Sequence, residues 1–106
     1  MVTTLTQKNH KKVVEEATKP VIIDVYATWC GPCIQMKPFF EKLAEELGNS
    51  YVFAMINIDE SRDLAIHYSV TSVPTIIFIK NNKVVAREIG YMPINDLREK
   101  IQEYVG

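Results

Sequence analysis

Cys30 and Cys33 are the only two cysteines of the chain, and they stand three positions apart. They lie where an apolar, strand-like run gives way to a helical pattern. Positions i and i+3 of a helix share one face, with Cα atoms about 5 Å apart, which is within the range that a disulfide bond requires. The pair can therefore open and close one short disulfide with little backbone movement. This spacing indicates dithiol redox chemistry.

The two thiols are not expected to be equivalent. Cys30 would stand at the start of the helix, where unpaired backbone N–H groups and the positive end of the helix dipole favour an anion. Its thiolate should form more easily than that of Cys33, which lies one turn further in and should be more buried. Gly31 tolerates the tight turn between them, and Pro32 in the first helical turn has no hydrogen bond to lose.

Zinc binding and a purely structural disulfide are the alternatives to redox chemistry. Structural zinc needs four ligands. Besides the cysteines the chain offers only His10 and His67, which are distant in sequence and lack the spacing of ligands. A disulfide that closes so short a loop constrains the unfolded chain little. We expect no metal, and both histidines are predicted to be exposed and solvated.

Asp24 interrupts the otherwise apolar run Val21–Tyr26, which leads directly to the cysteines. Aspartate is usually exposed, but a run that is apolar on both faces is typical of a central strand covered by helices. We therefore expect Asp24 to be buried. Burial favours the neutral carboxyl and raises its pKa, so that the group could exchange a proton near neutral pH.

Alternating strands and helices are expected to position these side chains. The predicted strands are residues 1–4, 21–26, 51–58, 75–79 and 84–89. The predicted helices run from Thr6 to about Ala17, from the cysteines to Gly48 through Pro38, from Asp59 to about Tyr68, and from Pro93 to Val105. The strand-helix-strand order favours a parallel pair, whereas the Asn81-Asn82 turn makes the last two strands an antiparallel hairpin. The fold class is therefore α/β, with a central mixed sheet flanked by four helices.

The chain has 106 residues, 47% of them hydrophobic, and a formal net charge of −1. This length predicts one domain, residues 1–106, with a substantial core. The balanced charge provides no field that would attract nucleic acid or an anionic membrane surface. No apolar run is long enough to cross a membrane, and Met1–Lys12 lacks the apolar centre of a signal peptide. We therefore expect a cytoplasmic protein. In the reducing cytosol, two cysteines three positions apart are more often catalytic or metal-binding than structural.

Several of these features together resemble the thioredoxin family. They are Asp24, Trp29–Cys33, Pro38, Val73–Thr75 and Gly90, at the family's own relative spacings. The resemblance extends from about Leu5 to the C-terminus, and Trp-Cys-Gly-Pro-Cys is much more specific than a bare C-x-x-C. It implies a thioredoxin fold and a protein-disulfide reductase that acts by thiol-disulfide exchange.

The resemblance also implies roles for individual residues. Asp24 would assist the deprotonation of Cys33, through water. The peptide bond before Pro74 would be cis and face the disulfide, and the backbone of Val73 would pair with an extended segment of the substrate.

Four further residues would contribute to substrate binding. Trp29 would shield the site and offer a docking face, and Gly90 would leave room for the backbone of a partner. Gly31 and Pro32, between the cysteines, complete this set.

The implied electron donor is a thioredoxin reductase, which uses NADPH and FAD, so that no cofactor binds to this chain itself. The other partners would be disulfide-containing proteins. The protein itself would be a monomer that acts in electron transport and general redox homeostasis.

Two departures from the family concern the site. Met55 stands where many thioredoxins have a lysine near the buried aspartate, and Ile34 follows Cys33 where many carry a lysine, which makes the rim less basic and could alter partner choice.

Two other functions remain open from the sequence. An oxidase or isomerase can use the same fold, although Gly-Pro between the cysteines favours a reductant. A binding module, in which the cysteines are incidental, would keep its activity when both cysteines are replaced.

Overall fold

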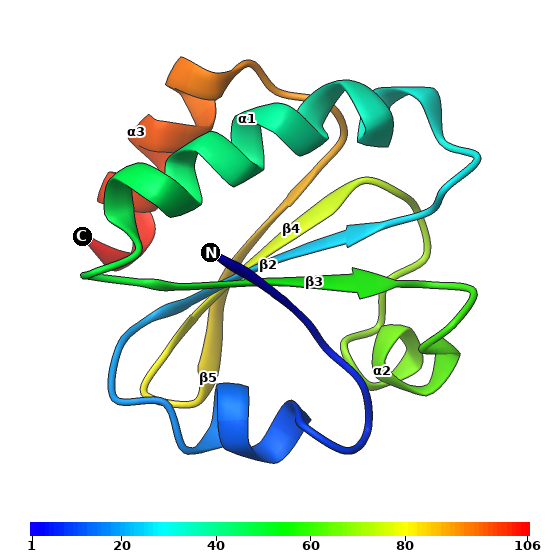
Figure 1. The fold of residues 1–106 in the computed structure, drawn as a ribbon, viewed down its shortest axis with the longest axis horizontal. Helices are drawn as coiled ribbons and strands as arrows, with labels where there is room; N and C mark the ends of the chain where they lie inside the picture. Colours follow the sequence, from blue (N-terminus) through cyan, green and yellow to red (C-terminus); the bar gives the residue numbers. More distant parts are fainter.

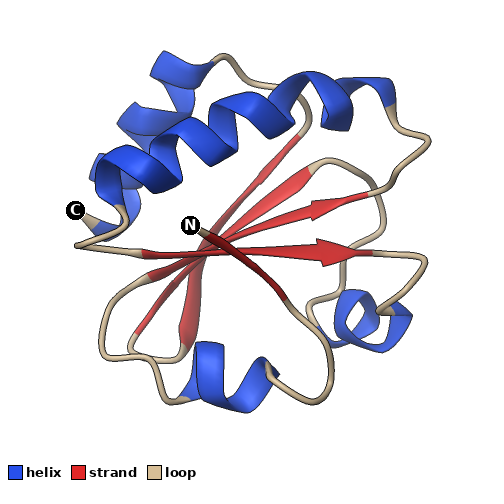
Figure 2. Ribbon diagram, in the orientation of Figure 1, coloured by secondary structure: helices blue, strands red, loops and turns tan.

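A five-stranded sheet forms the centre of the molecule, and helices cover both of its faces (Figures 1 and 2). The computed structural model describes all residues, Met1–Gly106. The strands are β1 (Val2–Thr4), β2 (Val21–Tyr26), β3 (Val52–Asn57), β4 (Thr75–Lys80) and β5 (Lys83–Ile89). The helices are the π-helix η1 (Lys11–Glu15) and the α-helices α1 (Gly31–Leu47), α2 (Arg62–His67) and α3 (Ile94–Val105). The predicted mixed sheet with four flanking helices is confirmed.

The sheet has the strand order β1-β3-β2-β4-β5. β3 pairs in parallel with both β1 and β2, whereas β4 is antiparallel to β2 and to β5. β2 is the middle strand, and its first five residues are buried because helices lie over both faces. The carboxyl ends of β2 and β3 consequently lie at one edge of the sheet, next to the start of β4 (Figure 1).

Alternate residues of β2 point to two separate cores. Ile22 belongs to the core under α1 and α3, where it clusters with residues such as Phe40 and Leu97. Ile23 belongs to the core under η1 and α2, together with residues such as Leu64. By the same alternation Asp24 faces the side of α1, the helix that carries the cysteines.

Local predictions for α1, the hairpin and α3 agree with the structure. α1 runs unbroken through Pro38 and buries Met36 and Phe40. The hairpin turns at Asn81 and Asn82, whose φ angles of 53° and 60° lie in the left-handed region that asparagine tolerates. In α3 the last inward-facing residue is Val105.

The first predicted helix, Thr6 to about Ala17, is wrong in extent. Regular helical structure is limited to Lys11–Glu15, and residues before it form turns. Thr6 nevertheless starts the helical turns, because its Oγ1 accepts from the N–H of Lys8 at 3.2 Å while the side-chain oxygen of Asn9 accepts from the N–H of Thr6 at 2.8 Å, a reciprocal cap of the first turn. The regular segment is short because the backbone widens within it, where the N–H of Glu16 bonds five residues back to the carbonyl of Lys11.

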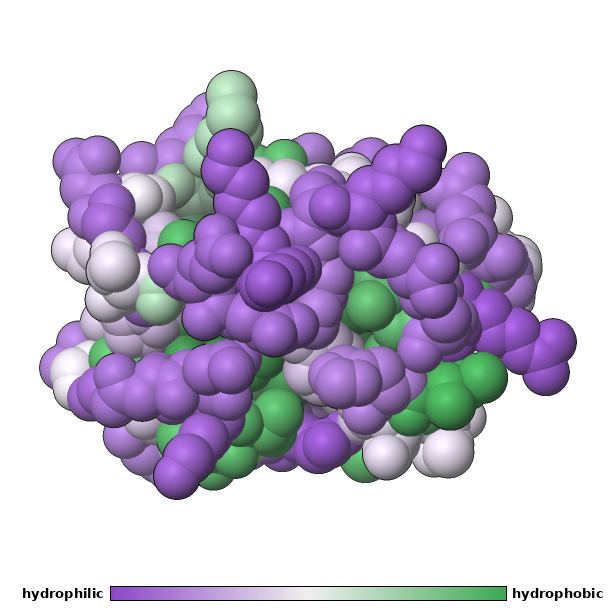
Figure 3. All heavy atoms as spheres, turned by 90° about the horizontal axis from the view of Figure 1, so that it is seen from below, coloured by the Kyte–Doolittle hydropathy of each residue, from purple (hydrophilic) through white to green (hydrophobic).

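His10 is buried, and its predicted exposure was wrong. Only 8% of its surface is exposed, and its Nε2 lies 2.5 Å from the hydroxyl of Tyr68. Tyr68 follows α2 and is 58 positions away, so that no local pattern indicates the contact. His67 is exposed, as predicted. Hydrophilic side chains cover most of the face that carries η1 and α2, with smaller hydrophobic patches between them (Figure 3).

Candidate active site

Cys30 and Cys33 form a disulfide at the start of α1, with their Cα atoms 5.2 Å apart. Cys30 is the N-cap residue of the helix, and its φ of −91° and ψ of 112° are extended. Its Sγ accepts a hydrogen bond from the backbone N–H of Cys33 at 3.2 Å. An N–H group directed at this sulfur would stabilise a thiolate on Cys30, and the positive end of the helix dipole acts in the same direction.

Both cysteines are largely buried, and Cys33 is the more buried of the two. The exposed fraction is 6% for Cys30 and 3% for Cys33. They cluster with Ala27, and the side chains of Ile58 and Val73 pack against this cluster. Residues that follow β2 and β3 and residues that precede β4 thus meet at the disulfide.

Asp24 is fully buried, as predicted. It stands in register between Met55 on β3 and Ile76 on β4, and neither of its carboxyl oxygens has a hydrogen-bond partner. Burial raises its pKa from the ordinary value of 3.8 to about 7. No cation contributes to this shift, since an uncharged methionine occupies the neighbouring position on β3. The carboxyl is therefore balanced between its two protonation states near neutral pH.

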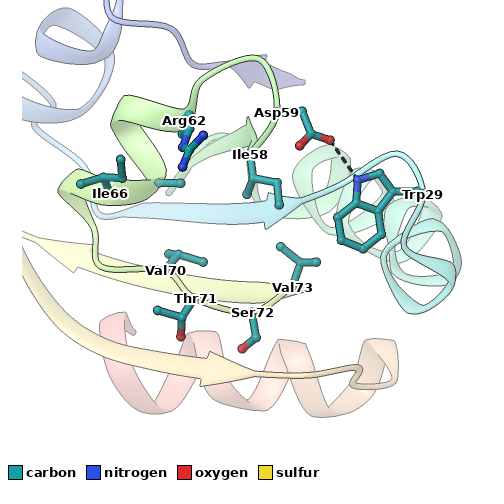
Figure 4. A pocket seen from close by; sticks show the side chains of 10 residues that line it. Trp29, Ile58, Asp59, Arg62, Ile66, Val70, Thr71, Ser72 and Val73 are labelled. Atoms are coloured by element: carbon teal, nitrogen blue, oxygen red, sulfur yellow. Dashed lines mark hydrogen bonds between the residues drawn. The ribbon is translucent and has the colours of Figure 1, made fainter.

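Trp29 stands at the surface beside the disulfide, with 68% of it exposed. Its indole Nε1 donates to the carboxylate of Asp59 at 3.0 Å (Figure 4). The side-chain oxygen of Asn57 in turn accepts from the backbone N–H groups of Asp59 at 2.9 Å and Glu60 at 3.3 Å. Asp59 and Asn57 were not predicted as site residues. Their place directly at the carboxyl end of a buried parallel strand is the signal that could have indicated them.

The Val73-Pro74 peptide bond is cis, and the prediction of this isomer is confirmed. The side chain of Val73 packs against the cysteine cluster, although about forty positions separate the two stretches. Neither the N–H nor the C=O of Val73 takes part in a hydrogen bond within the protein. Both groups therefore remain able to pair with another extended chain.

Gly90 lies next to this loop, because its N–H donates to the carbonyl of Pro74 at 2.8 Å. Its φ of 101° favours glycine, and no heavy atom lies within 4 Å of the point where a Cβ would stand. Gly31 has equally open surroundings. Pro32 and Ile34 are exposed on the same turn of α1, so that the rim near the disulfide is apolar.

A cleft of about 640 Å³, which we call the Trp29 cleft, is lined in part by Ile58 and Val73, the side chains that pack against the cysteines. Trp29 and Val73 line one end of it, while residues of α2 and Val70 line the other (Figure 4). Six of its ten lining residues are hydrophobic. The cleft can therefore hold apolar side chains of a chain that lies against Val73.

The thioredoxin family model matches residues 1–103 of the chain. The chain belongs to the thioredoxin family. It is 37% identical to a thioredoxin of Chlorobaculum thiosulfatiphilum, over 95% of this chain and 94% of that protein. It is 39% identical to a thioredoxin of Mycoplasma genitalium, over 88% and 90% of the two chains, and 38% identical to the mitochondrial thioredoxin of Mus musculus, over 90% and 57%.

Family membership and the Cys30-Cys33 disulfide together identify a thiol-disulfide oxidoreductase. No three His, Cys, Asp or Glu side chains come together in an arrangement that could hold a metal ion. None of the helices has the length and apolar character needed to span a membrane.

Proposed function

We propose that the protein reduces disulfide bonds in other proteins, with electrons supplied by a thioredoxin reductase. The observation that carries this proposal is the hydrogen bond from the Cys33 N–H to the Sγ of Cys30 at the start of α1. A sulfur in this position is stabilised as the thiolate, which is the form that attacks a disulfide.

The reaction proceeds in two exchanges. The Cys30 thiolate attacks one sulfur of the substrate disulfide, and the other substrate sulfur leaves as a thiolate that takes up a proton. Cys33 then gives its proton to Asp24, through water, and its thiolate attacks the Sγ of Cys30. The second substrate sulfur is released and protonated, so that two electrons pass to the substrate and the Cys30-Cys33 disulfide forms.

Substrate recognition would use groups that the protein itself leaves free. An extended substrate segment would pair with the N–H and C=O of Val73, and Trp29 would cover its side chains. Gly90, Gly31 and Pro32 would admit the substrate backbone close to the sulfurs.

The oxidised protein must be reduced again after each turnover. In this proposal a thioredoxin reductase does so with NADPH through its FAD, and this chain binds no cofactor itself. The protein would act as a monomer in the cytoplasm, in electron transport and general redox homeostasis.

A redox titration of the Cys30/Cys33 pair tests the proposal directly. We expect the pair to be more reducing than glutathione, because a reductant must transfer its electrons to substrate disulfides. We also expect NADPH consumption when a thioredoxin reductase and a disulfide-containing protein are added, and none with the Cys30→Ser variant. A potential as high as that of a disulfide-forming oxidase would contradict the direction of electron transfer.

A further inference from the structure

We propose that Arg62 is a specificity-determining residue, which favours substrates with an acidic side chain a few residues from the reactive disulfide. The inference rests on the proposed function, since the acidic side chain reaches Arg62 only while the substrate disulfide lies at Cys30. The occupant of the Trp29 cleft is accordingly an extended substrate segment with an apolar residue and a carboxylate.

Apolar side chains line most of the Trp29 cleft. Trp29 lies at one end, beside the cysteines, and Ile66 on α2 at the other (Figure 4). These are large hydrophobic side chains with 68% and 67% of their surfaces exposed, and Val70 and Val73 line the opposite wall. A bound segment would remove this surface from water, which favours an aliphatic or aromatic side chain between the two ends.

Two charged side chains line the Trp29 cleft, and only one of them has a partner. The carboxylate of Asp59 accepts the hydrogen bond from Trp29 at 3.0 Å. The guanidinium of Arg62 takes part in no hydrogen bond, and no acidic side chain lies within the 4.0 Å of an ion pair. Arg62 is therefore the one cation in the cleft that is free to bind a ligand.

A carboxylate is the group that fits this cation best. Guanidinium presents a planar fork of N–H donors that matches the two oxygens of a carboxylate, and the hydrogen bonds are charge-assisted. Asp59, Glu60 and Asp63 stand near Arg62 in the chain and outweigh its charge, so the field at longer range does not attract an acidic ligand. The preference for acid must then come from direct contact. Because Val73 would fix the register of the substrate backbone, only one or two substrate positions reach Arg62.

Short disulfide-linked peptides test the inference. Each peptide has nine residues, with one central cysteine joined to thionitrobenzoate, and a single Glu or Gln placed at each of the other positions in turn. The second-order rate constant of thionitrobenzoate release is measured with the wild type, with Arg62→Gln and with Arg98→Gln. Arg98 is a matched control, because it lies on α3 and pairs with Glu46 at 3.0 Å.

We expect Glu to react about 2- to 5-fold faster than Gln at one or two adjacent positions, as for a partly exposed ion pair. Arg62→Gln should lose the difference in rate between the Glu and Gln peptides, whereas Arg98→Gln should keep it. Arg62→Glu should prefer Lys at the same positions. Equal rates for Glu and Gln at every position, or a preference for Glu that persists in Arg62→Gln, would overturn the role of Arg62 and leave the proposed function standing. Failure of the wild type to reduce any peptide overturns the proposed function as well.

Discussion

The two sulfurs and one carboxyl of the active site differ in their surroundings. The Sγ of Cys30 receives a backbone N–H, whereas the Sγ of Cys33 receives none. Asp24 has no polar partner at all, and its proton is held by burial alone. A thiolate is therefore favoured on the first cysteine, while the buried carboxyl remains available as a base near neutral pH.

The first prediction concerns the roles of the cysteines. Cys33→Ser should accumulate mixed disulfides with substrates through Cys30, because no second thiol is present to release them. Cys30→Ser should accumulate almost none, since Cys33 is more buried and lacks the N–H contact. Mass spectrometry after mixing with a disulfide-containing protein measures both. Faster alkylation of Cys33 than of Cys30 at mildly acidic pH would reverse the assignment.

The second prediction concerns the pH dependence that Asp24 imposes on stability. Its pKa is about 7 when folded and 3.8 when exposed, so the folded state binds the proton more tightly. The free energy of unfolding should then fall as pH rises from about 4 to 7, by about 4 kcal/mol in total, and stay level above that range. Asp24→Asn should be free of this loss, and more stable than the wild type at pH 8.

Denaturant melts of both proteins from pH 4 to pH 9 measure the effect. The stability difference should grow up to about pH 7 and then remain constant, and the variant should reduce disulfides more slowly because Cys33 has lost its base. A variant that is no more stable than the wild type at pH 8 would indicate a cation near the carboxyl.

At the scale of elements, the strands could be predicted, and the first helix could be predicted in its place but not in its extent. β2 and β3 are apolar runs apart from Asp24 and the terminal Asn57, which is the direct consequence of burial on both faces. The Asn81-Asn82 turn was likewise evident, because asparagine tolerates the positive φ that such a turn requires. The first helix departs from α-helical geometry where the N–H of Glu16 bonds five residues back to Lys11, and helical periodicity does not reveal that wider turn.

The contacts that assemble the site were predictable only in part. Burial of Asp24 follows from its apolar neighbours in the strand, and Cys30 at the helix start follows from the Gly-Pro after it. The bond between Trp29 and Asp59 joins side chains 30 positions apart, and that between His10 and Tyr68 joins side chains 58 apart. Such pairs depend on how two elements pack, which one sequence does not specify.

The third prediction concerns the loop after β3 as a support for Trp29. Asp59→Ala removes the acceptor of the indole N–H, so the ring should become more mobile and bind substrates less well. Because Trp29 is the single tryptophan, fluorescence anisotropy reports its mobility directly. We expect faster depolarisation and a several-fold lower kcat/KM, with the free energy of unfolding changed by about 1 kcal/mol or less. Asp63→Ala is the control, and an equal effect there would exclude a specific support.

The fourth prediction concerns the contact between η1 and the end of α2. Burial and the nearby His67 lower the pKa of His10, partly opposed by Glu15. The folded state therefore binds this proton less readily than the unfolded chain, and stability is lost as pH falls below about 6.5. His10→Gln should cost about 1 to 3 kcal/mol at pH 7.5, where the Tyr68 bond is intact, and less at pH 5.

Denaturant melts at both pH values measure that difference, and Tyr68→Phe provides the comparison. Tyr68→Phe removes the hydroxyl but leaves the buried imidazole. It should therefore lower the free energy of unfolding at pH 7.5, and that free energy should still fall further as the pH becomes acidic. A cost of His10→Gln that is the same at pH 5 and pH 7.5 would show that His10 does not titrate in this range.

At the scale of the whole molecule, the fold and the redox site are separable. The two large hydrophobic clusters lie on opposite faces of the sheet and contain neither cysteine. The cysteines form a small cluster of their own with Ala27. The disulfide closes a loop between positions only three apart, whereas the β2–β3 and β2–β4 pairings join distant parts of the chain. The sheet and its two cores should thus hold the active site in place in either redox state.

The last prediction follows from this separation. Replacing both cysteines by alanine should leave the fold intact and lower the free energy of unfolding, relative to the oxidised protein, by about 2 kcal/mol, the chain-entropy value for so short a loop. Circular dichroism and a denaturant melt measure fold and stability, and the same sample should reduce no disulfide. A variant that unfolds at room temperature would mean that the cysteines are structural. A folded variant that kept the activity of the protein in cells would instead favour a binding module, in which the same cleft serves a partner without any exchange of electrons.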